Sequence, residues 1–257
     1  RFAAQKKGNI ILPEPSYTYW AEAALFLGLQ RIPVPLTKEK KISLSELLKK
    51  INPGSRLIYI CNPNNPTGTV CEKAGLISFI KEASKKTMVV VDEAYIDYSG
   101  EPSVCDLVKE NKNLAVVRTF SKIHGLAGAR VGYLMAHTTS IEKISRLQSW
   151  PNGSTSVASL AGAMASLKDE VFIPESRQKN EAAKKLTVTE LEKMGLHPIP
   201  SFSNFLYFSL SNYKDDYFGR LKAEQIIGTK IYEEEGRWTR ITIGSMDEMQ
   251  QFIAALR

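Results

Sequence analysis

The sequence predicts an α/β fold in which a mostly parallel sheet is covered by helices on both faces. Short, continuous apolar runs such as RLIYIC and MVVVD are typical of strands that are buried on both sides. Patterns typical of helices separate these runs, as connections between parallel strands require. The 257 residues suffice for a sizeable core, and 43% hydrophobic with 24% charged residues is ordinary for a globular protein.

The first half of the chain supplies this alternation. NIILPEP (9–15) is typical of a strand that ends at prolines, and YWAEAALFLGL (19–29) has helical character. Ser43 and Glu46 have the spacing of a capping box, which predicts a helix over 44–51. Four further apolar runs and one helical pattern complete the sheet: we expect strands at 56–63, 88–95, 113–121 and 129–136, and a helix at 75–86.

The character of the chain changes near residue 150, where SWPNGSTS forms a cluster of breaker residues. A small-residue stretch and a long amphipathic helix (about 175–195) follow, with strand candidates in HPIPSFSNFLYFSL and TRITIG and a closing helix in MDEMQQFIAALR. We therefore expect a large domain over 1–150 and a smaller C-terminal α+β domain over 151–257. The opening RFAAQKKGNIIL resembles a helix that runs into a strand, so we also expect the N-terminal part of the large domain to be missing.

Composition and charge exclude several classes of partner. The net charge of +7 does not indicate nucleic-acid binding, because lysines alternate with acidic residues in segments such as KEKKISLSELLKK. No apolar run approaches the roughly 20 residues of a membrane-spanning helix, so we predict no membrane partner. The three cysteines show neither metal-ligand spacing nor a disulfide framework. The sequence therefore predicts a cytoplasmic protein without a metal site.

Polar side chains gather where the predicted strands end. The carboxyl ends of parallel strands meet at one edge of a sheet, and ligands bind at that edge. There the sequence places an amide, a carboxylate, a phenol, two hydroxyls, a lysine and an arginine: Asn65, Asp92, Tyr95, Thr119, Ser121, Lys122 and Arg130. We expect these side chains to converge on one site.

This set of groups matches the chemical requirements of pyridoxal 5′-phosphate. A carboxylate keeps a pyridine nitrogen protonated, hydroxyls and an arginine bind a phosphate, and a lysine amine condenses with an aldehyde. A lysine Schiff base and an acidic partner for the ring nitrogen are what proteins usually contribute to this cofactor. The sequence therefore predicts pyridoxal 5′-phosphate as the cofactor, with Lys122 and Asp92 as its central partners.

Four segments, in the right order along nearly the whole chain, resemble the signatures of fold-type I pyridoxal-phosphate aminotransferases: NPNNPTG, VDEAYIDY, TFSKIHGLAGARVGY and RITIG. The histidinol-phosphate aminotransferase-like branch is the most similar. The resemblance implies that Lys122 forms the Schiff base and moves the α-proton of the substrate, and that Asp92 pairs with the ring nitrogen. It also implies that Asn65 and Tyr95 hydrogen-bond the phenolate oxygen of the ring.

The remaining implied roles are binding roles. Thr119, Ser121 and Arg130 would bind the cofactor phosphate, and Tyr17 would stack on the ring. Arg240 would hold the α-carboxylate of the substrate as a bidentate fork. The implied reaction moves an amino group from a small-molecule donor to a 2-oxo acid such as 2-oxoglutarate, and the implied assembly is a homodimer.

The sequence departs from the family pattern just before the RITIG strand, where histidinol-phosphate enzymes carry another arginine. Gly228 and Thr229 stand near that position and Lys230 is adjacent, which leaves a plain or aromatic amino acid open as the donor. Two other functions stay open on this scaffold. One is a decarboxylase of a phosphorylated amino acid, since threonine-phosphate decarboxylase has similar motifs, and the other is a module that keeps the fold without catalysis.

Overall fold

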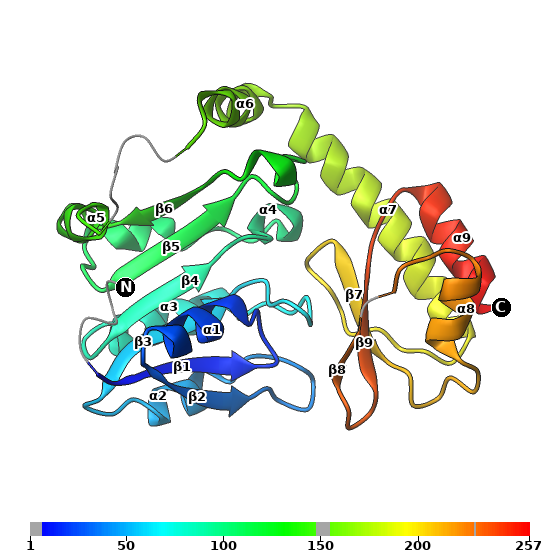
Figure 1. The fold of residues 1–257 in the computed structure, drawn as a ribbon, viewed down its shortest axis with the longest axis horizontal. Helices are drawn as coiled ribbons and strands as arrows, with labels where there is room; N and C mark the ends of the chain where they lie inside the picture. The colour runs from blue at the N-terminus through cyan, green and yellow to red at the C-terminus, as the bar shows by residue number, and fades with distance from the viewer. Residues whose placement is uncertain (1–6, 148–154, 229) are drawn as a thin grey trace.

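The computed structural model describes residues 7–147, 155–228 and 230–257, and these residues form two sheets (Figure 1). The strands of the larger sheet lie in the order β2-β1-β3-β4-β5-β6, parallel throughout except that β6 runs antiparallel to β5. This arrangement confirms the predicted fold class. The strands of this sheet are β1 (Asn9–Glu14), β2 (Gln30–Pro35), β3 (Ser55–Cys61), β4 (Met88–Asp92), β5 (Leu114–Thr119) and β6 (Gly132–Ala136).

Helices cover both faces of the larger sheet, because its strands direct apolar side chains alternately into two cores. Along β3, Ile58 packs in the core formed with α2 (Leu44–Lys49) and α3 (Lys73–Ala83). The next residue, Tyr59, packs on the opposite face in the core formed with α1 (Tyr19–Phe26). A strand with two buried faces reads as one continuous apolar run, and this explains the pattern of RLIYIC.

Three observed details differ from the predicted elements. β2 is not among the expected strands, because Pro33 and Pro35 argue against one; it lies at the edge of the described sheet, where a missing N–H is tolerated. The strand predicted at 88–95 ends earlier, at Asp92. Short helical segments join the later strands: α4 (Ile96–Ser99), η2 (Cys105–Lys109), η3 (Ala127–Ala129) and α5 (Thr138–Ser145).

The smaller sheet has the order β7-β9-β8, with antiparallel neighbours: β7 (Phe205–Ser209), β8 (Ile231–Glu233) and β9 (Trp238–Thr242). Its β7 residues Leu206 and Phe208 belong to a core with the helices of this half. Tyr207 lies between them in sequence and therefore faces the other way, toward the larger sheet. Arg240 stands directly opposite Tyr207 in the β7–β9 ladder, so Arg240 shares that face.

The helices of this half are α6 (Val157–Lys168), α7 (Phe172–Lys193), α8 (Tyr217–Ala223) and α9 (Met246–Leu256). Figure 1 shows α7 running from the side of β5 and β6 to the smaller sheet, with α9 and α8 beside its second half. Most apolar clusters lie within one half of the chain, but a smaller one joins Phe120 and Val131 to Ala163 of α6, across the expected division. The division at 1–150 and 151–257 therefore stays a prediction. The expected boundary itself, in SWPNGSTS, falls largely outside the described residues.

The described residues include neither a membrane-spanning helix nor a cluster of metal-binding side chains. No helix among them is both long and apolar enough to cross a bilayer. No group of three or more histidine, cysteine, aspartate or glutamate side chains in the described ranges is arranged to hold a metal ion.

Candidate active site

A cavity of about 350 Å³ opens at the carboxyl ends of β3, β4 and β5. All eight residues predicted to bind the cofactor line it: Tyr17, Asn65, Asp92, Tyr95, Thr119, Ser121, Lys122 and Arg130. They come from four separate connections of the larger sheet, and the parallel strand order alone brings them together. The same cavity has five further lining residues: Trp20, Cys61, Ala94, Val117 and Arg118.

Asp92 is fixed at the base of this cavity. It is the last residue of β4, and only 8% of it is exposed. The Tyr59 hydroxyl donates to its Oδ2 at 2.9 Å, and the Ala94 N–H donates to Oδ1 at 3.0 Å. Burial raises the pKa of Asp92 above its ordinary value, although these hydrogen bonds and the charge of Lys122 oppose that rise. A cation placed against this carboxylate would relieve the cost of burying it.

Lys122 lies in the turn between β5 and η3, and the local sequence explains its place. Gly125 adopts a left-handed φ of 69°, and its N–H closes the turn by donating to the Lys122 carbonyl at 2.9 Å. The amine lies 5.1 Å from the centre of the Tyr95 ring. Burial lowers the pKa of Lys122, and repulsion by Arg240 lowers it further. A lysine with a lowered pKa is more often neutral, which is the form that attacks an aldehyde.

Hydroxyls and cations occupy the side of the cavity next to β5. The Ser121 N–H donates to Thr119 Oγ1 at 3.0 Å, so the two residues form one compact turn. Arg130 has a left-handed backbone (φ 53°), and its Nη1 donates to the Ala127 carbonyl at 2.8 Å. Arg118 also reaches this side, where it pairs with Glu93 at 3.0 Å. This group of donors is suited to a phosphate.

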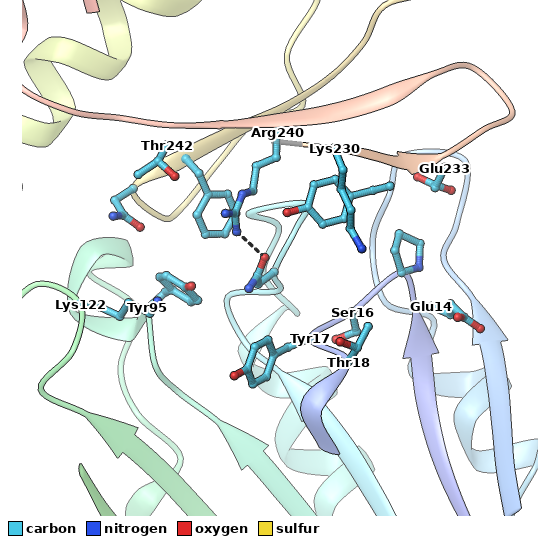
Figure 2. Close-up of a pocket in the computed structure, with 15 residues that line it drawn as sticks. Glu14, Ser16, Tyr17, Thr18, Tyr95, Lys122, Lys230, Glu233, Arg240 and Thr242 are labelled. Carbon is cyan, nitrogen blue, oxygen red and sulfur yellow. Dashed lines mark hydrogen bonds between the residues drawn. The ribbon is translucent and has the colours of Figure 1, made fainter. Parts of the chain in front are cut away.

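A second cavity of about 730 Å³ lies between the two sheets (Figure 2). It shares Tyr17, Asn65, Tyr95 and Lys122 with the first cavity, so the two adjoin at the lysine. Figure 2 shows Arg240 descending into it from β9, with Tyr95 and Lys122 on the facing wall. The lining also includes residues that sequence reasoning did not single out for the site: Glu14, Ser16, Thr18, Asn204, Phe205, Lys230, Tyr232, Glu233 and Thr242.

Arg240 is held in a defined position within this second cavity. Its Nη1 donates to Asn65 Oδ1 at 2.7 Å, which joins the predicted substrate residue to a predicted cofactor residue. Its guanidinium carbon lies 4.8 Å from the centre of the Phe205 ring and 5.8 Å from that of Tyr232. An arginine stacked on aromatic rings is suited to bind a planar carboxylate or a phosphate.

Several lining residues carried no usable signal in the sequence. Trp20 stacks on Tyr59 with ring centres 5.5 Å apart, and both read as ordinary core positions. Cys61 ends β3 beside the cavity, and burial raises the pKa of its thiol. Arg118 directly precedes the TFSK segment, and this adjacency is the one hint that could have pointed to it.

The lining of the first cavity fits pyridoxal 5′-phosphate. The buried Asp92 carboxylate suits a protonated ring nitrogen, and Lys122 supplies an amine of lowered pKa for the aldehyde. Thr119, Ser121 and Arg130 form the donor group that a phosphate needs. The chemistry of this set is therefore that of the predicted cofactor.

Comparisons with known proteins agree with this fit. The family model for aminotransferase class I and II matches residues 1–256. A histidinol-phosphate aminotransferase of Halalkalibacterium halodurans is 35% identical over 96% of this chain and 68% of its own length. That of Moorella thermoacetica is 34% identical over 97% of this chain and 65% of its own length. The chain thus spans about two thirds of these curated relatives.

Solved structures show the same fold. The histidinol-phosphate aminotransferase of Clostridium acetobutylicum matches with a TM-score of 0.89 at 25% identity, over 99% of this chain and 78% of that one. The enzyme of that name from Sinorhizobium meliloti, solved in complex with pyridoxal-5′-phosphate, matches with a TM-score of 0.88 at 24% identity, over 99% of this chain and 72% of that one. This chain therefore belongs to the aminotransferase class I and II family and is a transaminase-type enzyme that uses pyridoxal 5′-phosphate.

Proposed function

We propose that this enzyme moves the amino group of histidinol phosphate, or of an amine with a similar acidic group, to 2-oxoglutarate. The observation that best supports this proposal is that the two cavities adjoin at Lys122, with Asp92 in one and Arg240 in the other. A substrate whose acidic group lies at Arg240 can thus present its amine beside Lys122. The names of the curated relatives support histidinol phosphate as the donor.

Each residue of the first cavity has a defined task in this proposal. Pyridoxal 5′-phosphate, when bound, supplies an aldehyde for the amine and a ring that withdraws electrons from the α-carbon. Asp92 keeps the ring nitrogen protonated, and Tyr17 stacks against the ring. Tyr95 donates to the ring oxygen as a neutral phenol, since burial raises the pKa of Tyr95. The Asn65 amide NH₂ is the group left to donate there, because its Oδ1 already accepts from Arg240.

Lys122 carries the proton in this proposal. Its lowered pKa favours the neutral amine, which can accept the α-proton of the substrate and return it to the adjacent carbon. Thr119, Ser121 and Arg130 hold the phosphate and thereby keep the ring at a fixed distance from Lys122. Positioning of this kind is a large part of catalysis when two reacting groups must meet in one geometry.

The second cavity supports a donor with an acidic group. Arg240 lines it, and so does Lys230, near the position where the sequence lacks the arginine of histidinol-phosphate enzymes. Lys230 can supply a second positive charge, although as a point charge and not as a planar fork. Thr229, the other residue near that position, lies outside the described residues.

A half-reaction screen tests the proposal. The cofactor-loaded protein is mixed with histidinol phosphate, histidinol, glutamate or phenylalanine, and bleaching of its visible band and formation of the keto product are measured. We expect histidinol phosphate and glutamate to react faster than histidinol and phenylalanine. Equal rates for histidinol and histidinol phosphate would exclude a phosphate-selective donor site. Release of carbon dioxide would identify a decarboxylase, and a band that resists every donor would identify a module without turnover.

Three further expectations stay proposals. We propose a homodimer, which light scattering on the purified protein tests, and a cytoplasmic location, which cell fractionation tests. The three cysteines are all free in the described structure, which supports a reducing compartment. We also propose that 1–150 and 151–257 are separate domains, and limited proteolysis near residue 150 tests that division.

A further inference from the structure

Lys40 occupies an unusual position in the connection between β2 and α2. Its backbone has a φ of 59°, in the left-handed region that residues other than glycine seldom adopt. Only 14% of its side chain is exposed, and a buried lysine almost always has a charged partner. The amine lies 2.9 Å from each carboxylate oxygen of Glu233 and 4.5 Å from the centre of the Trp238 ring. An outlier that the surrounding contacts enforce points to a functional constraint.

Glu233 connects this lysine to the strand pair that carries Arg240. It ends β8 and lines the second cavity. The Tyr207 hydroxyl donates to its Oε1 at 2.7 Å, and Tyr207 stands opposite Arg240 in the β7–β9 ladder. Tyr207 also stacks on Trp238, the ring beneath Lys40, with centres 5.2 Å apart. The ion pair is therefore joined through packed side chains to the residue next to Arg240.

The backbone of Lys40 connects in the other direction, to the turn that carries Asn65. Thr69 Oγ1 donates to the Lys40 carbonyl at 2.9 Å, and Thr69 is in turn hydrogen-bonded to Thr67 at 2.8 Å. Asn65 lies in the same turn and accepts the hydrogen bond from Arg240. Lys40 thus contacts β8 and β9 of the smaller sheet through its side chain, and through its carbonyl it contacts the connection that follows β3 of the larger sheet.

We propose that Lys40 and Glu233 are positioning residues, an ion pair between the two sheets that sets the place of Arg240 for the acidic group of the substrate. This proposal rests on the proposed function, in which Arg240 binds that group. The pair has a second effect, because Glu233 lines the substrate cavity. While Lys40 neutralises Glu233, the carboxylate does not repel an incoming anion; without Lys40 it would.

A double-mutant cycle on the cofactor-loaded, full-length protein tests the proposal, with Lys40→Met, Glu233→Gln and the two together. The probe is succinate, a dicarboxylate that has no amine to react, and its dissociation constant is measured by calorimetry. We expect Lys40→Met to weaken succinate binding roughly 10-fold, because it both frees the strand pair and exposes an unpaired carboxylate. Glu233→Gln leaves no unpaired carboxylate, so its loss should be about 3-fold.

The decisive result is the double variant, which should bind succinate more tightly than Lys40→Met does. A purely structural role for Lys40 predicts the reverse, since two lost contacts then cost more than one. Lys40→Arg keeps the charge and should bind nearly as tightly as the wild type. Lys41→Met, a change at the exposed neighbouring lysine, is the matched control and should have no effect. In turnover with glutamate, Lys40→Met should raise KM and leave kcat within about 2-fold.

Three outcomes would overturn the proposed role of the Lys40–Glu233 ion pair: unchanged succinate binding in Lys40→Met, an equal loss of binding in Lys41→Met, or a lower kcat with unchanged KM in Lys40→Met. Circular dichroism identifies a Lys40→Met protein that fails to fold, and the Glu233→Gln and Lys40→Arg variants then decide. Amide hydrogen exchange gives a readout that needs no turnover, since β9 should exchange faster in Lys40→Met than in Lys41→Met. If succinate binding changes across the three variants as expected but the protein transfers no amino group, the proposed function is rejected while the positioning role of the ion pair is kept.

Discussion

The carboxyl edge of the larger sheet and the facing side of the smaller sheet contribute to adjoining cavities, but they differ in how they are specified. At the edge of the larger sheet, every residue that the sequence predicts to bind the cofactor lines the same cavity. At the second, Arg240 alone was predicted, while Asn204, Lys230, Tyr232 and Glu233 were not. Strand ends are brought together by a general rule of parallel sheets. The docking of one sheet against another follows no such rule and depends on contacts between distant residues.

The two regions also differ in how firmly their groups are held. Asp92 is 8% exposed and accepts hydrogen bonds from the Tyr59 hydroxyl and the Ala94 N–H, which hold the carboxylate in place. Lys230, on the side of the smaller sheet, is exposed, and its amine lies 5.5 Å from the centre of the Tyr232 ring. This difference matches the proposed function, in which the first side carries the chemistry and the second side recognises the substrate. Substitutions on the first side should therefore lower mainly kcat, and substitutions on the second side should raise mainly KM.

The largest effect should come from the cofactor side. Lys122→Ala removes the amine that, in the proposed function, receives the aldehyde and carries the proton, so we expect turnover to fall by about 10³-fold or more. The visible band that forms with added pyridoxal 5′-phosphate should also be absent. Lys86→Ala, at an exposed lysine, is the control and should behave like the wild type. A Lys122→Ala protein that still turned over at a tenth of the normal rate would end the assignment of this lysine.

Asp92→Asn should lower kcat by about 10²-fold, because a neutral amide no longer keeps the ring nitrogen protonated. Stability should respond with a definite sign. Burial raises the folded-state pKa of Asp92 above its ordinary 3.8, so its contribution is fully present below that pH and is lost as pH rises through the raised pKa. Wild type without cofactor should therefore lose stability relative to Asp92→Asn as pH rises above 3.8, measured by urea unfolding. Wild type that gained stability relative to Asp92→Asn as pH rose would contradict the raised pKa.

On the recognition side, Arg240→Lys should change binding more than chemistry. Lysine keeps the charge but cannot form a planar fork, so we expect KM for glutamate to rise roughly 10- to 100-fold with a smaller change in kcat. Steady-state kinetics check this split. Arg237→Lys, an exposed arginine three residues earlier, should leave both constants unchanged. A fall in kcat alone would instead place Arg240 with the chemical residues of the first cavity.

The smallest effect should come from the contact between the halves at Gly68. Its φ is 74°, and a Cβ there would clash with Ser201 Oγ, so Gly68→Ala combines backbone strain with a steric clash. We expect it to lower the free energy of unfolding by about 2–3 kcal/mol in urea titrations. Gly195 has a similar φ of 76° with nothing within 4 Å, so Gly195→Ala should cost only about 1 kcal/mol. Equal losses would mean that the Ser201 contact carries no weight.

Particular residues show why prediction succeeded in some places and not in others. Ser43 was expected to open a helix, and its Oγ does accept from the Glu46 N–H at 3.4 Å, because capping depends only on neighbours in the chain. β2 escaped notice because its two prolines argue against a strand, and only its edge position makes them harmless. Glu233 was not predicted to belong to the site, since nothing near it in sequence indicates Lys40, which lies 193 residues away.

The sequence by itself determined the alternation of strands and helices, the groups at the strand ends and the cofactor chemistry that they match. Those features follow from local periodicity and from a sheet rule that needs no further coordinates. The tertiary structure alone decided that Arg240 meets Asn65, that Glu233 faces Lys40 and that a second cavity adjoins Lys122. These contacts join residues far apart in the chain, and their free energy is set by distance and burial, which no local pattern encodes.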